Sequence, residues 1–312
     1  MIRPLLLPLA CLATCLAQQA LDDRTPADPG QAVLPLSDES KLKAIEEAFR
    51  AGYGEDFQGV TRNEAGKTVF RFRDAEFIYE DGRSKTFAER LADPDIEDTF
   101  RPVYPLSNPT DTLPENFDPG RFRVEALFKT LYGATEAEVA KNCVTVDFCG
   151  NKVKFNARCG AAKALAEVGK ELDEAVKAKP ALKAYLTNLG GTLQWRFIAG
   201  TKQLSNHSFG TAIDLNVDKS AYWRWEKPDK LKTFTRKDWP VEIIAAFERH
   251  GFIWGGKWWH FDTMHFEYRP ELIHFARSQA GAPAAEGAPA EAGEGAKKQA
   301  PAPHEFLEPL KE

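Results

Sequence analysis

The sequence predicts an α+β fold, with a small antiparallel sheet flanked by helices and an additional N-terminal α+β lobe. Apolar residues recur every three or four positions over 38–49 and again over 156–175, as they do on one face of a helix. They alternate with other residues over 69–79 and 212–217, which is typical of half-buried strands. Each half of the chain therefore combines helices with short strands.

Composition indicates a soluble globular chain. Of 312 residues, 43% are hydrophobic and 28% are charged, which excludes a wholly disordered, collagen-like or multispan membrane protein. Lys and Arg number 41 against 46 Asp and Glu, for a net charge of −5. Because proteins that hold nucleic acid use a basic excess to neutralise phosphates, we expect no nucleic-acid partner.

Residues 1–20 resemble a signal peptide. A short apolar run, LLLPLACLATCLA, follows Arg3 and precedes small residues at Ala17 and Ala20. The run is too short to span a bilayer as a helix, so we expect export to a periplasmic or extracellular location, with no integral membrane span after cleavage. A buried N-terminal helix is opposed by Pro8. A lipoprotein acylated at Cys15 is a further alternative, although Thr14 is unusual before such a cysteine.

The remaining chain divides into four predicted regions. Residues 21–37 form a polar, Pro-containing leader, and 38–120 form the N-terminal lobe and a Pro-rich connection. In that lobe we expect a helix from Asp38 and a strand and hairpin that end in the Asp81-Gly82 turn. Residues 121–276 form the second domain, and 277–312 form a low-complexity tail, whose last residues either dock or fray.

Within the second domain we expect two helices and a strand before the most informative motif, and one helix after it. The helix over 156–175 buries a stripe at Ala161, Leu165, Val168 and Leu172. A short helix follows before Gly190-Gly191, and another runs from Asp238 to Gly251. Residues 192–200 alternate like a strand, which places Arg196 away from the larger aromatic face.

Three cysteines remain after signal cleavage: Cys143, Cys149 and Cys159. In an oxidising compartment we expect one disulfide and one spare thiol, and the sequence does not decide which pair closes. A structural zinc knuckle is disfavoured because no Cys-x-x-Cys pair and no nearby His accompany them.

The segment SNHSFGTAIDLNV contains a candidate metal site. In the strand pattern, Asp214 shares a face with Ala212, and this small neighbour leaves room for a ligand. His207 lies before Gly210, where the chain can bend and bring an imidazole and a carboxylate to one ion. Both side chains are ligands that tetrahedral zinc accepts.

The segment FDTMHFEYRP offers a third ligand and a base. His265 and Glu267 share one face of a short strand. Asp262 lies in the turn before this strand, where it can take a proton from a water molecule that the metal activates. Two His and one Asp would then bind one Zn²⁺ per chain and leave a position open.

The two segments SNHSFGTAIDLN and WGGKWWHFDTMHFEY resemble the Ser-x-His-x-x-Gly-x-Ala-x-Asp and Asp-x-x-His motifs of M15 zinc peptidases. This group contains D-alanyl-D-alanine carboxypeptidases and L-alanyl-D-glutamate endopeptidases. The close resemblance covers about Leu193 to Leu272, with a looser one back to Arg121. Asp at the base position, in place of Glu, is similar to the endolysin-like branch.

The resemblance implies a role for each matching residue. His207, Asp214 and His265 would bind zinc, and Asp262 would be the catalytic base. Arg196 would stabilise negative charge or bind a substrate carboxylate, and Ser205 would contact substrate. A plain surface role for Arg196 is the alternative.

Two aromatic features remain open at this stage. Six of the seven tryptophans lie between Trp223 and Trp259, where they either line a groove or pack the core, and we expect Trp258 to line the site. His260 is either a fourth ligand or, as we favour, an aromatic partner.

The predicted function is an exported zinc metallopeptidase that hydrolyses peptidoglycan stem peptides. The sequence does not distinguish a D-Ala-D-Ala carboxypeptidase from an L-Ala-D-Glu endopeptidase. Two alternatives are a catalytically silent peptidoglycan-binding module with a zinc site and a zinc peptidase that acts on proteins. The intact Asp262 argues against the silent module.

Overall fold

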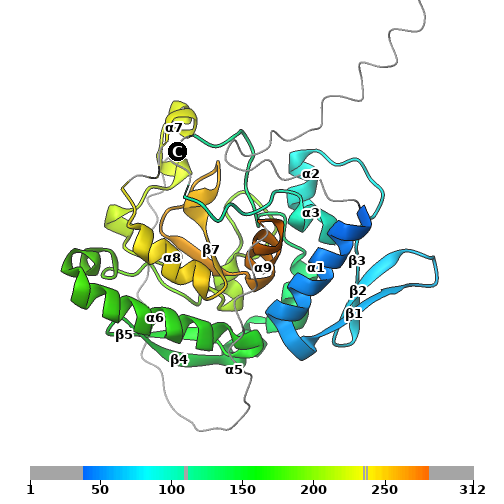
Figure 1. The fold of residues 1–312 in the computed structure, drawn as a ribbon, viewed down its shortest axis with the longest axis horizontal. Helices are drawn as coiled ribbons and strands as arrows, with labels where there is room; N and C mark the ends of the chain where they lie inside the picture. Colours follow the sequence, from blue (N-terminus) through cyan, green and yellow to red (C-terminus); the bar gives the residue numbers. More distant parts are fainter. Residues whose placement is uncertain (1–37, 109–111, 235, 237, 281–312) are drawn as a thin grey trace, which may run out of the picture.

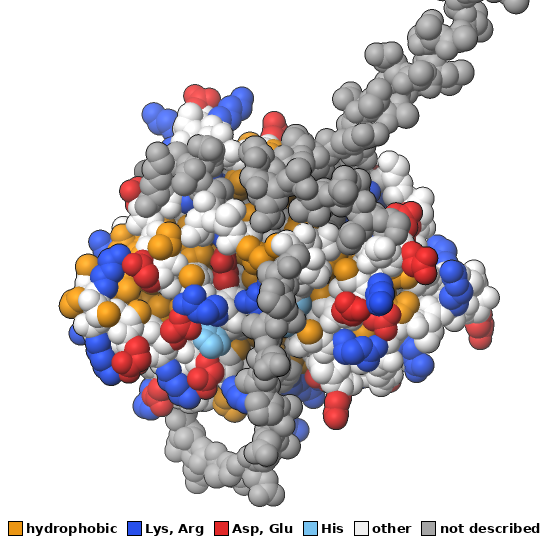
Figure 2. Space-filling model, viewed as in Figure 1, with side chains coloured by type: hydrophobic (Ala, Val, Ile, Leu, Met, Phe, Trp, Pro, Cys, Tyr) orange, Lys and Arg blue, Asp and Glu red, His pale blue; other side chains and the backbone are white. Residues whose placement is uncertain are grey.

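A computed structural model of the protein describes residues 38–108, 112–234, 236 and 238–280. Helices surround three small antiparallel sheets (Figure 1), which confirms the predicted mixture of helices and small sheets. On the face shown in Figure 2, positive and negative side chains are interspersed. The predicted signal peptide, the leader and residues 281–312 of the predicted tail lie outside the described residues.

The N-terminal part is a helix packed on a three-stranded sheet. Helix α1 (Asp38–Tyr53) is followed by β1 (Phe57–Arg62), β2 (Thr68–Phe72) and β3 (Ala75–Ile78), in the order β1-β2-β3. The predicted helical face is confirmed, since Ile45 and Phe49 are fully buried. The short helices α2 (Phe87–Ala92) and α3 (Ile96–Phe100) complete this part, and each begins with a capping box.

The hairpin turn in this part differs from the prediction. Strands β2 and β3 are joined at Arg73 and the next residue, and Arg73 adopts a left-handed backbone with φ 53°. Asp81 lies after β3, where its carboxylate accepts hydrogen bonds from Arg83. The predicted hairpin turn at Asp81-Gly82 is therefore wrong. Asp81 lies in the loop after β3, where its carboxylate forms an ion pair with Arg83.

The middle of the chain contains a hairpin covered by a long helix. Helices α4 (Glu125–Tyr132) and α5 (Glu136–Asn142) lead to β4 (Cys143–Phe148) and β5 (Asn151–Asn156), and α6 (Ala161–Ala178) packs on both strands. The stripe predicted for this helix is confirmed, because Leu165, Val168 and Leu172 are fully buried. The three cysteines of this region are free thiols, so the expected disulfide is not formed.

The third sheet joins two distant parts of the second half. Its strands are β6 (Ala212–Asp214), β7 (Phe252–Trp254) and β8 (His265–Tyr268), in the antiparallel order β6-β8-β7. Helices α8 (Val241–Arg249) and α9 (Pro270–Gln279) pack against β7, and α7 (Pro228–Thr233) lies between β6 and α8 in the sequence. Strand β6 ends at Asp214, earlier than the alternating pattern predicts. The structure also contains short 3-10 helices at Gly54–Asp56, Arg158–Gly160, Pro180–Tyr185, Asn206–Phe209, Val217–Lys219, Trp223–Trp225 and Gly255–Lys257.

Two predicted elements lie before this sheet, and one of them is wrong. The short helix predicted before Gly190 is present as the 3-10 helix Pro180–Tyr185, which ends earlier than predicted, whereas residues 192–200 are not a strand. The backbone N–H of Gln194 donates to the carbonyl of His207, and that of Arg196 donates to Ser208 Oγ. Because these partners belong to a turn instead of a neighbouring strand, the alternating segment forms no ladder.

One large hydrophobic core contains residues of both the N-terminal part and the second half, and a second, small cluster lies at Leu231, Phe234 and Phe261. Helix α1 packs along α9, which directly follows β8 (Figure 1). The rings of Phe100 and Phe275 meet edge to face at 5.1 Å between centroids. The predicted division near residue 120 remains a prediction, and the two parts share this packed interface. No helix among the described residues is long and apolar enough to span a membrane.

Candidate metal centre

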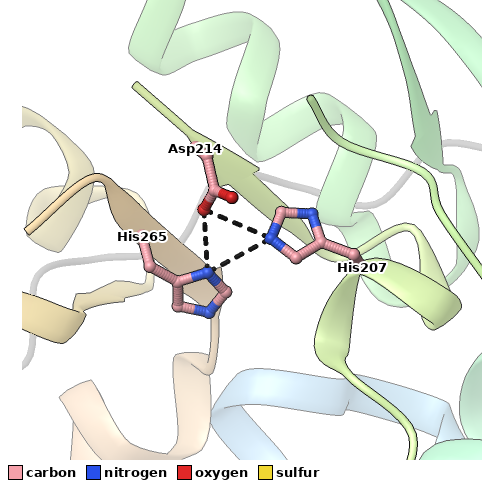
Figure 3. A group of neighbouring side chains, drawn as sticks. All are labelled: His207, Asp214 and His265. Carbon is pink, nitrogen blue, oxygen red and sulfur yellow. Dashed lines mark hydrogen bonds and ion pairs between the residues drawn. The ribbon is translucent and has the colours of Figure 1, made fainter. Parts of the chain in front are cut away.

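Three side chains meet at one end of the third sheet: His207, Asp214 and His265 (Figure 3). His207 Nε2 lies 3.2 Å from Asp214 Oδ1 and 3.3 Å from His265 Nδ1. His265 Nδ1 lies 3.0 Å from the same carboxylate oxygen. The structure therefore brings together the three predicted ligands in a compact triangle.

The position of His207 follows from a tight turn. Ser205 Oγ accepts a hydrogen bond from the His207 backbone N–H and begins the 3-10 helix Asn206–Phe209. Gly210 ends it with a left-handed backbone, φ 64°. A Cβ atom there would lie 2.7 Å from Cys143 Sγ, so glycine suits both the backbone and the close approach. The predicted bend at Gly210 is confirmed.

Strand pairing places the other two ligands. Asp214 on β6 is directly opposite His265 on β8. His265 and Glu267 share one face of β8, as the alternation predicts, because His265 Nε2 lies 3.0 Å from Glu267 Oε2. Phe266 points the other way, and its ring stacks on that of Phe247 at 4.0 Å.

The outward nitrogen of each imidazole is held by an acceptor. His207 Nδ1 lies 3.0 Å from the carbonyl oxygen of Thr192, and His265 Nε2 faces Glu267. A proton on each of these nitrogens leaves His207 Nε2 and His265 Nδ1 free to bind a cation. Metal-ligating histidines are typically oriented in this way.

The donor set fits zinc. In tetrahedral sites with metal–ligand distances of about 2.0 to 2.1 Å, neighbouring ligand atoms lie about 3.3 to 3.4 Å apart. The three separations here are 3.0 to 3.3 Å. Two imidazoles and one carboxylate, with the side chains almost fully buried, are therefore suited to Zn²⁺.

The charges of the triangle stabilise one another. Burial by itself raises the pKa of Asp214, but His207 and His265 outweigh it and hold that pKa far below its usual value. Burial lowers the pKa of His265, whereas Asp214 and Glu267 raise it to about 10. Without metal, Asp214 and Glu267 thus stabilise positive charge at this site.

Asp262 has the opposite electrostatic character. Burial and the negative charge of Asp214 raise its pKa to about 7, against the lowering effects of His265, Arg121 and Arg196. Its Oδ1 is buried and has no hydrogen-bond partner among the described residues. A carboxyl that is poised near neutral pH beside a candidate metal site has the properties of a general acid and base.

The other predicted site residues lie around this centre in different ways. The indole of Trp258 is buried, with its ring centroid 5.6 Å from that of His265. Arg196 is exposed and close enough to lower the pKa of Asp262. Ser205 is 5% exposed and caps the turn that carries His207, which is a local structural contact.

Sequence reasoning missed Arg121. Its guanidinium lies over the Trp258 ring, 5.5 Å from the centroid, and also lowers the pKa of Asp262. Its side chain is 18% exposed, and its Nη1 is 3.9 Å from Asp118 Oδ2. Arg121 follows the Pro-rich connection, and no pattern near it in the sequence indicates a role at the site.

His260 lies in an aromatic cluster, as we favoured. Its ring contacts those of Phe87, Trp223 and Trp259, and its Nδ1 lies 2.5 Å from Asp118 Oδ2. It is not one of the residues of the triangle. Core packing is confirmed for Trp254, which is fully buried, whereas Trp225 is 61% exposed and the groove-lining role remains a prediction.

A second acidic group lies in the N-terminal part, at Asp95, Glu97 and Asp98. Lys85 Nζ lies 3.0 Å from Asp95 Oδ2 and 2.7 Å from Asp98 Oδ2. This buried lysine thus pairs with two of the carboxylates, and Lys41 pairs with Glu97, so the group does not resemble the triangle.

Comparison with known proteins supports the same interpretation. A family model described as D-alanyl-D-alanine carboxypeptidase matches residues 199–268, which include both motifs, and this confirms the resemblance to M15 peptidases. A search of curated proteins and a search of solved structures found no match. The matched residues contain all three side chains of the candidate metal centre.

Proposed function

We propose that this protein is an exported, zinc-dependent peptidase that hydrolyses the stem peptides of peptidoglycan. The observation that carries the proposal is the triangle of His207, Asp214 and His265 inside the segment that matches the carboxypeptidase family model. The substrate class comes from the description of that family. The proposal of export rests on the signal-like residues 1–20.

The residues around the triangle have separate tasks in this proposal. His207 Nε2, His265 Nδ1 and Asp214 Oδ1 would hold a zinc ion, which would supply a Lewis acid for a peptide carbonyl and for water. Asp262 takes a proton from the attacking water and delivers it to the leaving amine. Its pKa of about 7 allows both directions of transfer near neutral pH.

Two arginines, Arg121 and Arg196, supply positive charge near Asp262. Both Arg121 and Arg196 act on the charge of that carboxyl. Guanidinium groups bind carboxylates through paired donors, and stem peptides carry carboxylates. We therefore assign them to binding the substrate carboxylate or the negative charge that develops at the carbonyl.

The decisive experiment is digestion of purified muropeptides by the mature protein, with and without a chelator, followed by mass spectrometry. Chelator-sensitive release of the terminal D-alanine would identify a carboxypeptidase. Cleavage between L-alanine and D-glutamate would identify an endopeptidase. Binding of both zinc and muropeptides without cleavage would overturn the proposal in favour of a silent binding module, and cleavage of casein alone would favour a peptidase that acts on proteins.

A further inference from the structure

A chain of buried hydrogen bonds connects helix α1 to the metal centre. It begins at Tyr53, at the end of α1, passes through Glu271, Arg269 and Glu267, and reaches His265. All five residues are less than 9% exposed. Tyr53, where this series of hydrogen bonds begins, lies far outside the segment that matches the family model, residues 199–268.

Each link is a direct contact with good distance. The Tyr53 hydroxyl donates to Glu271 Oε2 at 2.7 Å, and Arg269 Nε donates to Glu271 Oε1 at 2.6 Å. Arg269 Nη1 donates to Glu267 Oε1 at 3.1 Å. The other oxygen of Glu267 faces His265 Nε2 at 3.0 Å. Both oxygens of each glutamate are thereby engaged.

The surroundings hold Arg269 in one place. Its Nη1 also donates to the carbonyl oxygen of Gly120 at 2.7 Å, and its guanidinium lies over the ring of Phe128 at 5.2 Å. Along this series of hydrogen bonds the charges alternate, from the carboxylate of Glu271 to the guanidinium of Arg269 to the carboxylate of Glu267. A buried charged group that loses its hydrogen-bond partner costs folding free energy. When a side chain at one end of the series is changed, we therefore expect the neighbouring side chain to move and regain a partner.

We infer that Tyr53, Glu271 and Arg269 are positioning residues for the metal ligand His265, so that helix α1 forms part of the metal centre. Glu267 orients the imidazole directly, and the three more distant residues orient Glu267. The packing of α1 along α9 brings the Tyr53 hydroxyl to Glu271. This inference rests on the proposed function only in taking zinc as the bound metal.

The test compares two buried tyrosines. Tyr53→Phe removes the hydroxyl that begins the chain. Tyr104→Phe is the matched control, because the Tyr104 hydroxyl also donates to a buried glutamate, Glu248 Oε1 at 2.5 Å, in a network without any of the three ligands. Zinc affinity of the full-length, metal-stripped proteins is measured by competition with a chromogenic chelator. Thermal unfolding of the same proteins reports general stability.

We expect Tyr53→Phe to weaken zinc binding about three- to tenfold, less than the roughly 10- to 100-fold cost of changing a group that contacts a ligand directly. Tyr104→Phe should retain wild-type zinc affinity, even if both variants melt at a lower temperature. Glu271→Gln is a second variant, which removes the charge that faces Arg269 and should weaken zinc binding in the same direction.

Wild-type zinc affinity in both Tyr53→Phe and Glu271→Gln would overturn the inference and leave the proposed function intact. Equal loss of affinity in Tyr53→Phe and Tyr104→Phe would also overturn it, since the effect would then follow from general destabilisation. A wild-type protein that does not bind zinc would overturn both the inference and the proposed function.

Discussion

Glu267 lies two residues after His265 on β8, and its Oε2 is 3.0 Å from His265 Nε2. This contact selects which imidazole nitrogen faces Asp214. Glu267→Gln keeps the size of the side chain but removes its charge, so we expect zinc affinity to fall about tenfold, at the lower end for such contacts. Competition with a chelator measures it. The control is Glu248→Gln, another buried glutamate, which pairs with Lys257. Equal affinities for the two variants would contradict the role of Glu267.

Zinc affinity is expected to rise with pH. Asp214 and Glu267 raise the pKa of His265 to about 10 in the protein without metal, so this imidazole carries its extra proton at neutral pH. Zinc must displace that proton from Nδ1. Affinity should therefore increase by about tenfold per pH unit below that pKa, with release of about one proton from His265. Titration calorimetry at pH 7 in two buffers of different ionisation enthalpy counts the protons, and a count of zero contradicts the assignment.

Asp262 separates metal binding from turnover. Asp262→Asn removes the proton acceptor and keeps the shape, so we expect normal zinc content and a loss of about 10²- to 10⁴-fold in kcat. His207→Ala removes a ligand and should abolish both zinc binding and turnover. Metal analysis and muropeptide hydrolysis provide the two readouts. An Asp262→Asn variant with nearly full activity would exclude Asp262 as the base.

The pH–rate profile tests the same residue in the wild-type protein. Only the ionised carboxylate accepts a proton, so the rate should rise with pH through the pKa of Asp262. Burial and Asp214 raise this pKa to about 7, and a bound cation opposes the charge of Asp214. We expect the acidic limb to have its midpoint at or below about pH 7. A rate that falls over that range would have the wrong sign for a carboxylate base.

Arg121 and Arg196 should act on both the substrate and Asp262. Each lowers the pKa of Asp262, so Arg121→Ala or Arg196→Ala should move the acidic limb to higher pH. We expect kcat/KM to fall by about 10- to 100-fold, less than for a fully preorganised donor. Arg62→Ala is the control, because Arg62 lies exposed on β1. An unchanged pH profile in both site variants would remove the arginines from the proposed mechanism.

Glycine is required at position 210 because the backbone is left-handed and Cys143 lies close by. Gly210→Ala places a Cβ atom 2.7 Å from Cys143 Sγ and forces alanine into a left-handed backbone. Gly66→Ala is the control, since Gly66 also has positive φ, but its Cβ would meet nothing within 4 Å. The backbone term costs about 1–2 kcal/mol in each, and Gly210→Ala should lose more in chemical denaturation. Equal losses would show that the contact with Cys143 relaxes freely.

The candidate site was more predictable than the fold around it. The face shared by His265 and Glu267 follows from the two-residue period of a strand, and the bend at Gly210 follows from the freedom of glycine. Both are local properties. The hairpin of β4 and β5 was also readable, because Val144, Val146 and Phe148 alternate before a Cys149-Gly150 turn with positive φ at both residues. This hairpin was not among the predicted elements.

Alternation misled the prediction for residues 192–200. The pattern is that of a strand, but the backbone N–H groups of Gln194 and Arg196 donate to the turn that carries His207. A segment becomes a strand only when a neighbouring backbone supplies partners in register. The sequence of the segment does not specify that neighbour. As a result Thr192 offers its carbonyl to His207 Nδ1, which no pattern predicted.

The sequence by itself determined which side chains meet at the metal centre, because ligand chemistry resides in residue type and the spacing within each motif is short. Only the tertiary structure decided what holds and tunes them. Arg121 lies over Trp258, and Tyr53 reaches Glu271 across 218 positions of sequence. Such contacts depend on how α1, α9 and the Pro-rich connection pack together. Hydrogen bonds between distant segments produce no periodic pattern in the sequence, so the sequence alone did not predict them.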